Sequence, residues 1–99
     1  MPSPAPKLDI QTQAAAAAFG ERLALARMRR GWARQRIADE AGISRTTLYK
    51  VEAGVPDVTL GTYLRVLSVL DMQGDIHGLA ANDVVGRQLQ DLALKPKRR

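Results

Sequence analysis

The sequence predicts an all-α fold of five to six helices. Hydrophobic residues make up 45% of the 99-residue chain, yet only 4% of its residues are aromatic. Alanine and leucine dominate the apolar set; both favour helices, whereas sheets usually need more β-branched and aromatic residues. Apolar residues also recur at intervals of three and four along the chain, which is the period of a helix with one buried face. A chain of this length suffices for one compact domain.

The first helix is expected over residues 13–30, with Thr12 as its N-cap. Three residues at helical spacing mark its buried face: Phe19, Leu23 and Ala26. Gly31 ends the helix. Residues 1–11 are predicted to be a disordered arm, because three prolines interrupt the first six positions.

Two short helices are expected next, over residues 34–41 and from Ser44 to about Ala53. Ser44 caps the second of them, and Gly42 separates the two. The side chains predicted to face inward are Ile37, Ala38, Ala41, Leu48 and Val51.

Three further helices complete the prediction. Thr59 caps a helix over residues 60–70, whose buried face is formed by Leu60, Leu64 and Leu67 and widened by Tyr63, Val66 and Leu70. A short helix over residues 75–80 buries Ile76 and Leu79. The last, over residues 84–92, is capped by Asn82 or Asp83. The expected organisation is a main domain over residues 12–81, a C-terminal helix over 82–94 and a basic tail over 95–99.

Charge is distributed unevenly along the chain, whose formal net charge is +5. Residues 20–54 contain eight basic and four acidic side chains, whereas residues 55–94 contain two basic and five acidic ones. The last five residues add four basic side chains. The basic block suits a polyanion such as nucleic acid, although a solvated surface gives the same composition.

Several function classes are not expected. The chain has no cysteine, so disulfides and thiolate chemistry are excluded. Its apolar runs are too short to span a bilayer, and no signal-peptide core is recognisable, so a cytoplasmic location is expected. No catalytic constellation is present. His77 lacks companions at metal-ligand spacing, so neither a metal nor a cofactor is expected, and the chain is not predicted to be an enzyme.

The informative stretch is residues 34–54, where two short helices meet at Gly42-Ile43-Ser44. The glycine permits a sharp turn, and Ile43 fills the angle between the helices. The second helix then projects its leading end outward. A helix in that position fits the major groove of DNA, where each base pair displays a distinct pattern of donors and acceptors.

Residues 35–54 resemble the helix-turn-helix of Xre/Cro-type repressors. The matching positions are Ile37-Ala38, Gly42-Ile43-Ser44, Leu48 and Val51-Glu52-x-Gly54. The resemblance implies a lambda-repressor-like DNA-binding domain that binds a double-stranded operator. The family usually has Thr-Gln where this chain has Ala33-Arg34. Loss of the threonine cap should cost roughly 1 kcal/mol, while an arginine such as Arg34 can still reach a DNA phosphate in place of the glutamine.

The resemblance also assigns roles to individual residues. Those expected to contact bases are Arg45, Thr46, Tyr49 and Lys50, of which Arg45 has the fork that matches guanine. Those expected at phosphates are Arg34, Arg36, Ser44 and Thr47, with Lys50 as a further candidate. For Tyr49 a packing role stays open, and for Ser44 and Thr47 a capping role. Arg27 and Glu52 correspond to an ion pair that fixes the recognition helix; the alternative is two unrelated surface charges.

Apolar residues beyond Leu70 suggest a second surface. Repressors of this family generally bind inverted half-sites as twofold dimers. The residues predicted to form dimer or partner contacts are Met72, Ile76, Leu79, Val84, Val85 and Leu89. The alternative is that they only complete the core of the monomer.

A narrower resemblance concerns residues 58–67, Gly86-Arg87-Gln88-Leu89 and the basic tail. These segments are similar to HipB-like antitoxins, which repress their own promoter and neutralise a HipA-like kinase toxin. Two alternatives stay open: a repressor without a toxin partner, and a protein-interaction module that has lost DNA binding. Trp32 is expected in the core rather than at a ligand.

Overall fold

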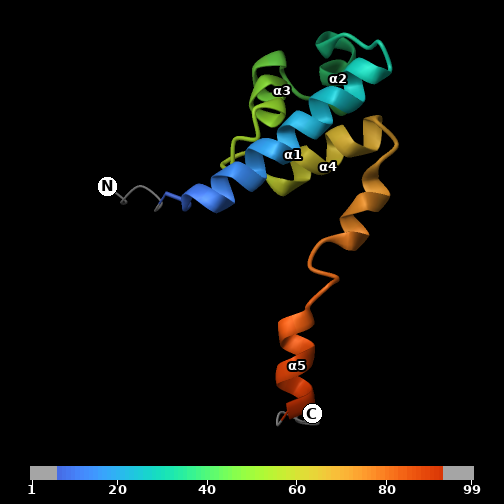
Figure 1. The fold of residues 1–99 in the computed structure, drawn as a ribbon. Helices are drawn as coiled ribbons and strands as arrows, with labels where there is room; N and C mark the ends of the chain where they lie inside the picture. Colours follow the sequence, from blue (N-terminus) through green and yellow to red (C-terminus); the bar gives the residue numbers. More distant parts are fainter. Residues whose placement is uncertain (1–6, 93–99) are drawn as a thin grey trace.

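The computed structural model describes residues 7–92, which form six helices and no strand. They are α1 (Ile10–Arg29), α2 (Arg34–Ala41), α3 (Arg45–Glu52), α4 (Leu60–Val69), the 3-10 helix η1 (Gln73–Gly78) and α5 (Val84–Leu92) (Figure 1). The predicted all-α class is therefore confirmed. None of the helices in this part of the chain is both long and apolar enough to cross a membrane.

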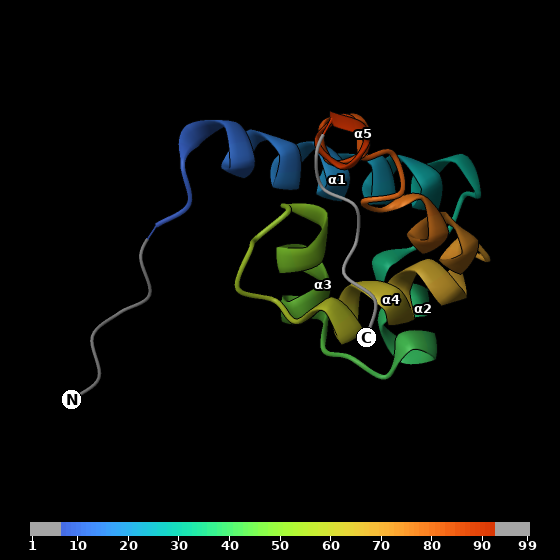
Figure 2. The same ribbon diagram turned by 90° about the horizontal axis from the view of Figure 1, so that it is seen from below.

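Helices α1 to α4 form one compact unit, which we call the helical body. The long α1 packs against α3, and α2 packs against both α3 and α4. The buried core draws on all four helices: Leu23, Ala26, Ile37, Ala38, Ala41, Leu48, Val51, Tyr63, Val66, Leu67 and Leu70. In the view from below, α2, α3 and α4 lie along one side of α1 (Figure 2). The body thus holds the two short helices of the motif against one continuous core.

Helix α1 begins three residues earlier than predicted, because the cap was assigned to the wrong residue. Asp9, not Thr12, is the N-cap: its Oδ1 accepts a hydrogen bond from the Thr12 backbone N–H at 2.7 Å. Aspartate is the stronger capping residue. Ile10 and Gln11, which the prediction placed in the disordered arm, are therefore helical. The prolines of that arm and the basic tail lie outside the described residues.

The buried face of α4 also differs from the prediction at its start. Leu60 is 59% exposed, and Leu64 is only half-buried. The fully buried positions are Tyr63, Val66, Leu67 and Leu70. Leu60 is the first residue of the helix and does not pack against the buried core. The Tyr63 hydroxyl is satisfied by donating to the Val55 carbonyl at 2.8 Å.

The predicted helix over residues 75–80 is wrong in type and in burial. The segment is the six-residue η1, a 3-10 helix that begins at Gln73 and packs on α4. Ile76 is half-buried, and Leu79, which was predicted to be buried, is 65% exposed. Short 3-10 turns are common connectors, since their hydrogen bonds are too poor to extend far.

Helix α5 spans the predicted residues and stands away from the helical body (Figure 1). Of the two predicted caps, Asp83 accepts a hydrogen bond from the Gly86 N–H at 2.9 Å. No residue of α5 is buried. The C-terminal helix therefore completes no part of the monomer core.

Candidate nucleic-acid interface

The turn between α2 and α3 is built on a left-handed residue. Gly42 has φ 69° and ψ 35°, a conformation that a Cβ atom opposes. The next N–H, that of Ile43, donates back to the Ala38 carbonyl at 3.0 Å, and the Ile43 side chain packs against the core. These contacts end α2 and redirect the chain within two residues, which sets the angle at which α3 leaves the turn.

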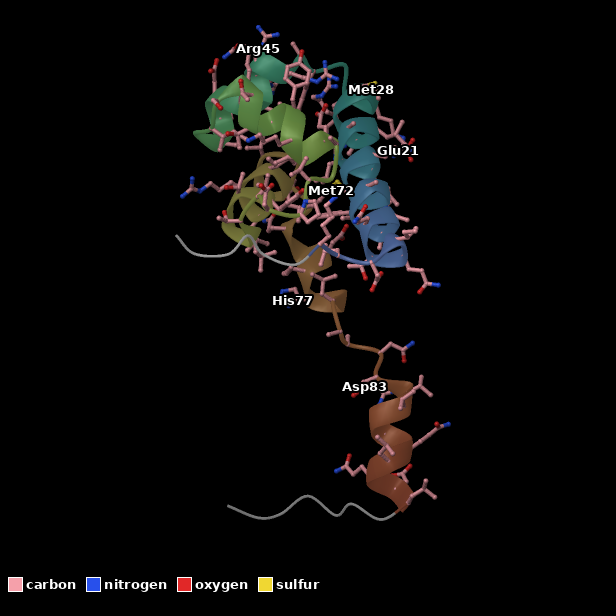
Figure 3. All side chains as sticks on the ribbon, turned by 90° about the vertical axis from the view of Figure 1, so that its left-hand side faces the viewer. Glu21, Met28, Arg45, Met72, His77 and Asp83 are labelled. Carbon is pink, nitrogen blue, oxygen red and sulfur yellow. The ribbon has the colours of Figure 1, made fainter. Side chains whose placement is uncertain are left out.

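Helix α3 is anchored by its inner side and exposed along its outer side. Leu48 and Val51 are both fully buried. The predicted base-contacting residues are on the other side and exposed: Arg45, Thr46, Tyr49 and Lys50. Figure 3 shows Arg45 at the end of the molecule opposite α5. The leading end of α3 is thus presented to solvent on a rigid support.

Ser44 and Thr47 begin α3 through two local hydrogen bonds. Ser44 Oγ accepts from the Thr47 backbone N–H at 3.0 Å, and the Ser44 hydroxyl donates to Thr47 Oγ1 at 3.0 Å. The capping role that the sequence left open is therefore present in the structure. A contact of either residue with phosphate stays a prediction.

The Glu52 carboxylate at the end of α3 links this helix to α1 and α2. Arg27 of α1 donates from Nε to Glu52 Oε2 at 2.6 Å and from Nη2 to Oε1 at 3.1 Å. Arg34 of α2 donates from Nε to the same Oε1 at 2.9 Å. The side chains of Arg27 and Glu52 are only 9% and 7% exposed, so water screens their attraction weakly. Arg27 also donates to the Trp32 carbonyl at 2.9 Å, which leaves this buried guanidinium well satisfied.

Arg34 has a structural contact that the sequence did not reveal. Ala33 gives α2 no side-chain cap, and Arg34 instead ties the start of α2 to the end of α3 through Glu52. That hydrogen bond raises the pKa of the guanidinium. The Arg34 side chain is still 38% exposed, so one edge of the group remains accessible.

Tyr49 lies among positive charges on the exposed side of α3. The Arg34 guanidinium lies 4.5 Å from the centre of the Tyr49 ring, which is a favourable cation–π distance. A hydrogen bond from Arg45, and the charges of Arg34 and Arg45, lower the pKa of the Tyr49 hydroxyl. The tyrosine therefore groups two candidate DNA-contacting arginines into one cationic cluster.

Arg36 is held by two neighbours. Its guanidinium lies 3.9 Å from the centre of the Trp32 ring, and its Nε donates to Glu40 Oε2 at 3.0 Å. The side chains of Arg36 and Glu40 are each 50% exposed. Trp32 is partly buried against the core, in the position expected for a packing residue. Whether Arg36 contacts phosphate stays a prediction.

A close approach of α1 and α3 was missed by the sequence analysis. A Cβ atom on Gly20 would overlap the backbone of Val51, Glu52 and Gly54. Gly54, with φ 70°, lies equally close to the backbone of Ala16. The available signal was a glycine inside an alanine-rich helix, where it is costly and needs a packing reason. Gly20 therefore helps to position α3.

These features define a helix-turn-helix DNA-binding regulator: a compact helical body, a tight turn and an exposed leading end on the second motif helix. Residues 18–77, more than half of the chain, match the family model described as a helix-turn-helix domain. The chain belongs to that family. No curated protein matches its sequence.

Proposed function

We propose that the protein is a sequence-specific transcriptional repressor of the Xre type, which acts on double-stranded operator DNA in the cytoplasm. The observation that carries the proposal is the two-sided character of α3. Its inner residues Leu48 and Val51 are fully buried, while Arg45 and its neighbours are exposed at the leading end. A helix held in this way inserts into the major groove without first paying an ordering cost.

In this proposal Arg45 and Thr46 contact base edges first, because they lie at the start of α3. Arg45 donates two hydrogen bonds to guanine O6 and N7, and Thr46 contacts a neighbouring base. Tyr49 and Lys50 lie one turn later and contact the next bases or their backbone.

The phosphate contacts are assigned to the flanks of the motif. Arg34 keeps Nε on Glu52 and directs its exposed edge toward the DNA backbone. Arg36 lies on the same short helix and is half exposed. Ser44 and Thr47 are at the N-terminus of α3, where backbone N–H groups and the helix dipole favour a phosphate. Contacts of this kind fix the register of the protein on the duplex.

The proposal includes a homodimer. One α3 contacts only a few base pairs, so an operator of useful length needs two copies on inverted half-sites. The proposed dimer contacts are the apolar residues beyond α4, of which two are half-buried and four exposed: Met72 and Ile76, then Leu79, Val84, Val85 and Leu89. They lie away from α3, so dimer formation leaves the DNA-binding end free.

Selection of bound sequences from random DNA tests the proposal with the purified full chain. We expect a recovered site with two inverted half-sites about one helical turn apart. Arg45→Ala should relax the preference at one base pair of each half-site and cost roughly 1–3 kcal/mol there. Arg87→Ala, at the far end of the molecule on α5, is the matched control and should leave the preference unchanged. Failure to enrich any sequence favours instead a protein-interaction module that has lost DNA binding.

A second candidate function is that of a HipB-like antitoxin, which is a repressor that also binds a HipA-like kinase toxin. It is favoured by the sequence similarity of residues 58–67 and of Gly86-Arg87-Gln88-Leu89. A kinase-like reading frame next to the gene, and stable co-purification of its product with this chain, are the expected results. A repressor without a toxin partner gives neither.

A further inference from the structure

An apolar groove of about 690 Å³ runs between α1, α4 and η1. Its lining includes Phe19 and Tyr63, whose rings are stacked with centroids 5.2 Å apart. Leu60 and Leu79 also line it and are 59% and 65% exposed. No segment of residues 7–92 covers this surface. Contiguous exposed apolar surface of this kind usually marks an interaction site.

Helix α5 carries a surface of matching character. Val85, Leu89 and Leu92 recur at i, i+4 and i+7, so they form one apolar stripe along the helix. Their exposed fractions are 65%, 51% and 81%, and no other described residue packs over them enough to bury them. A helix of nine residues is only marginally stable by itself, so this one needs a surface to pack on.

The connection between η1 and α5 directs α5 away from the groove. Leu79 lines the groove, and the next residues, 80–83, extend away from the helical body (Figure 1 and Figure 3). Ala80 in this connection has a positive φ of 58°. Helix α5 therefore projects toward solvent, where a second molecule is reached more directly than the groove of its own chain.

We propose that α5 of each copy lies in the α1–α4–η1 groove of a second copy, so that the regulator is a dimer formed by reciprocal helix exchange. The inference rests on the proposed function, because it specifies how the dimer required there is built. The occupant of the groove is thus a second copy of this chain.

Docking of α5 by its apolar stripe buries no charged side chain of that helix. The charged residues that line the groove are Arg22 and Arg29 of α1 and Asp75 of η1, all of them exposed. Arg87, Gln90 and Asp91 all lie away from the apolar stripe of α5, on the other side of the helix. A docked α5 therefore presents its apolar stripe to the groove and turns Arg87 and Asp91 toward water.

The area buried by exchange lies near the lower limit for a specific interface. A nine-residue helix, about 13 Å long and 10–12 Å wide, buries roughly 200–250 Å² when half of its lateral surface is covered. Exchange covers two helices and two grooves, which gives roughly 800–1,000 Å² in total, close to the approximately 1,000 Å² that a specific interface needs. A single α5 docked on one groove buries only half as much.

Disulfide trapping tests the exchange directly, because the chain has no native cysteine. Ala15→Cys places a thiol in the groove at an exposed position, and Val85→Cys or Leu89→Cys places one on the stripe. When an Ala15→Cys chain is mixed with a stripe variant and oxidised, we expect a covalent heterodimer. Gln90→Cys, on the opposite side of α5, is the control and should crosslink to Ala15→Cys at least about tenfold less.

Three outcomes overturn the exchange. Crosslinking of Val85→Cys only to itself means that two α5 helices pair with each other. A covalent monomer from the Ala15→Cys, Val85→Cys double variant means that α5 folds back on its own groove. Absence of any crosslink, with a monomeric mass at all concentrations, means that the groove has another occupant.

A second measurement separates the exchange from the proposed function. Leu89→Asp should weaken dimerisation at least about a hundredfold by sedimentation, since each dimer loses two buried leucines. Gln90→Asp adds the same charge on the other side of α5 and should change the dimer dissociation constant less than about threefold. Binding of a single half-site should be retained by both variants. If the wild-type chain does not bind a half-site, the result counts against the proposed function. If Leu89→Asp leaves the dimer dissociation constant unchanged, the result counts only against the exchange.

Discussion

The helical body and α5 both have apolar residues at helical spacing, but those of the body are buried and those of α5 are exposed. Every fully buried side chain of the described residues belongs to α1–α4 or to the residues that directly cap or follow them, whereas α5 buries none. Both regions have apolar stripes at helical spacing. The difference is that the stripes of the body face one another, while the stripe of α5 faces water.

This contrast separates the region that supports α3 from the region that we assign to dimer contacts. The part that supports α3 is complete within one chain, down to a satisfied buried arginine and a turn fixed by Gly42. In the proposed dimer, the apolar stripe of α5 is covered only when a second chain is present. On the proposed function, the geometry of α3 is therefore set by folding of one chain, whereas dimerisation depends on protein concentration.

The largest expected effect on the body comes from Glu52→Ala. Removing this carboxylate leaves Arg27 buried without its charge partner and also frees Arg34, so we expect a loss of about 3–5 kcal/mol of unfolding free energy. Urea denaturation followed by circular dichroism measures it.

The control for that variant is Glu40→Ala. Its pair with Arg36 is half exposed, so the loss should be only about 0.3–0.5 kcal/mol. Equal losses for the two variants would mean that the three-helix contact at Glu52 does not stabilise the body.

The next prediction compares one leucine from each region. Leu48→Ala removes a fully buried side chain from the body and should cost about 2–5 kcal/mol at any protein concentration. Leu92, on α5, is 81% exposed, so Leu92→Ala should cost less than about 0.5 kcal/mol in dilute protein. At concentrations where dimers form, Leu92→Ala should lower the thermal midpoint. A Leu92→Ala effect that does not vary with concentration would remove the distinction between the two regions.

A third prediction concerns the turn of the motif. Gly42→Ala meets no atom within 4 Å, so its cost is conformational and should be about 1–2 kcal/mol. Gly74→Ala also has open space around it, and Gly74 does not have a positive φ, so it should be nearly neutral. Denaturation of the two variants side by side separates the backbone effect from any effect of the added methyl group.

The sequence predicted the elements of the body because their signals are local. Gly42 and Ser44 mark the turn by their own backbone and capping preferences, and the spacing of Leu48 and Val51 identifies the inner side of α3. Leu60 and Leu79 were placed in the core because periodicity shows which residues share a side, not where the neighbouring helix ends. The groove that Leu60 and Leu79 line could not be predicted from the sequence for the same reason.

The contacts that the sequence missed depend on distant parts of the chain. Arg34 was expected only at a phosphate, because nothing near it indicates that Glu52, 18 residues later, lies within hydrogen-bond distance. Gly20 was passed over because its constraint comes from the backbone of α3. The ion pair of Arg27 and Glu52 was predicted from the family resemblance and not from residue spacing.

The smallest expected effect is at the start of α1, where the body begins. The hydrogen bond from the Thr12 backbone N–H holds the pKa of Asp9 below its ordinary value of 3.8. A carboxylate with a lowered pKa contributes stability above the pKa of the unfolded chain, and that contribution is lost as pH falls through the folded value. We therefore expect the first turn of α1 to fray only below about pH 3.8, while Asp9→Asn, which keeps a capping oxygen, should remove this pH dependence. A residue-resolved NMR titration of the Thr12 amide measures both, and a midpoint at or above 3.8 would assign the cap to another residue.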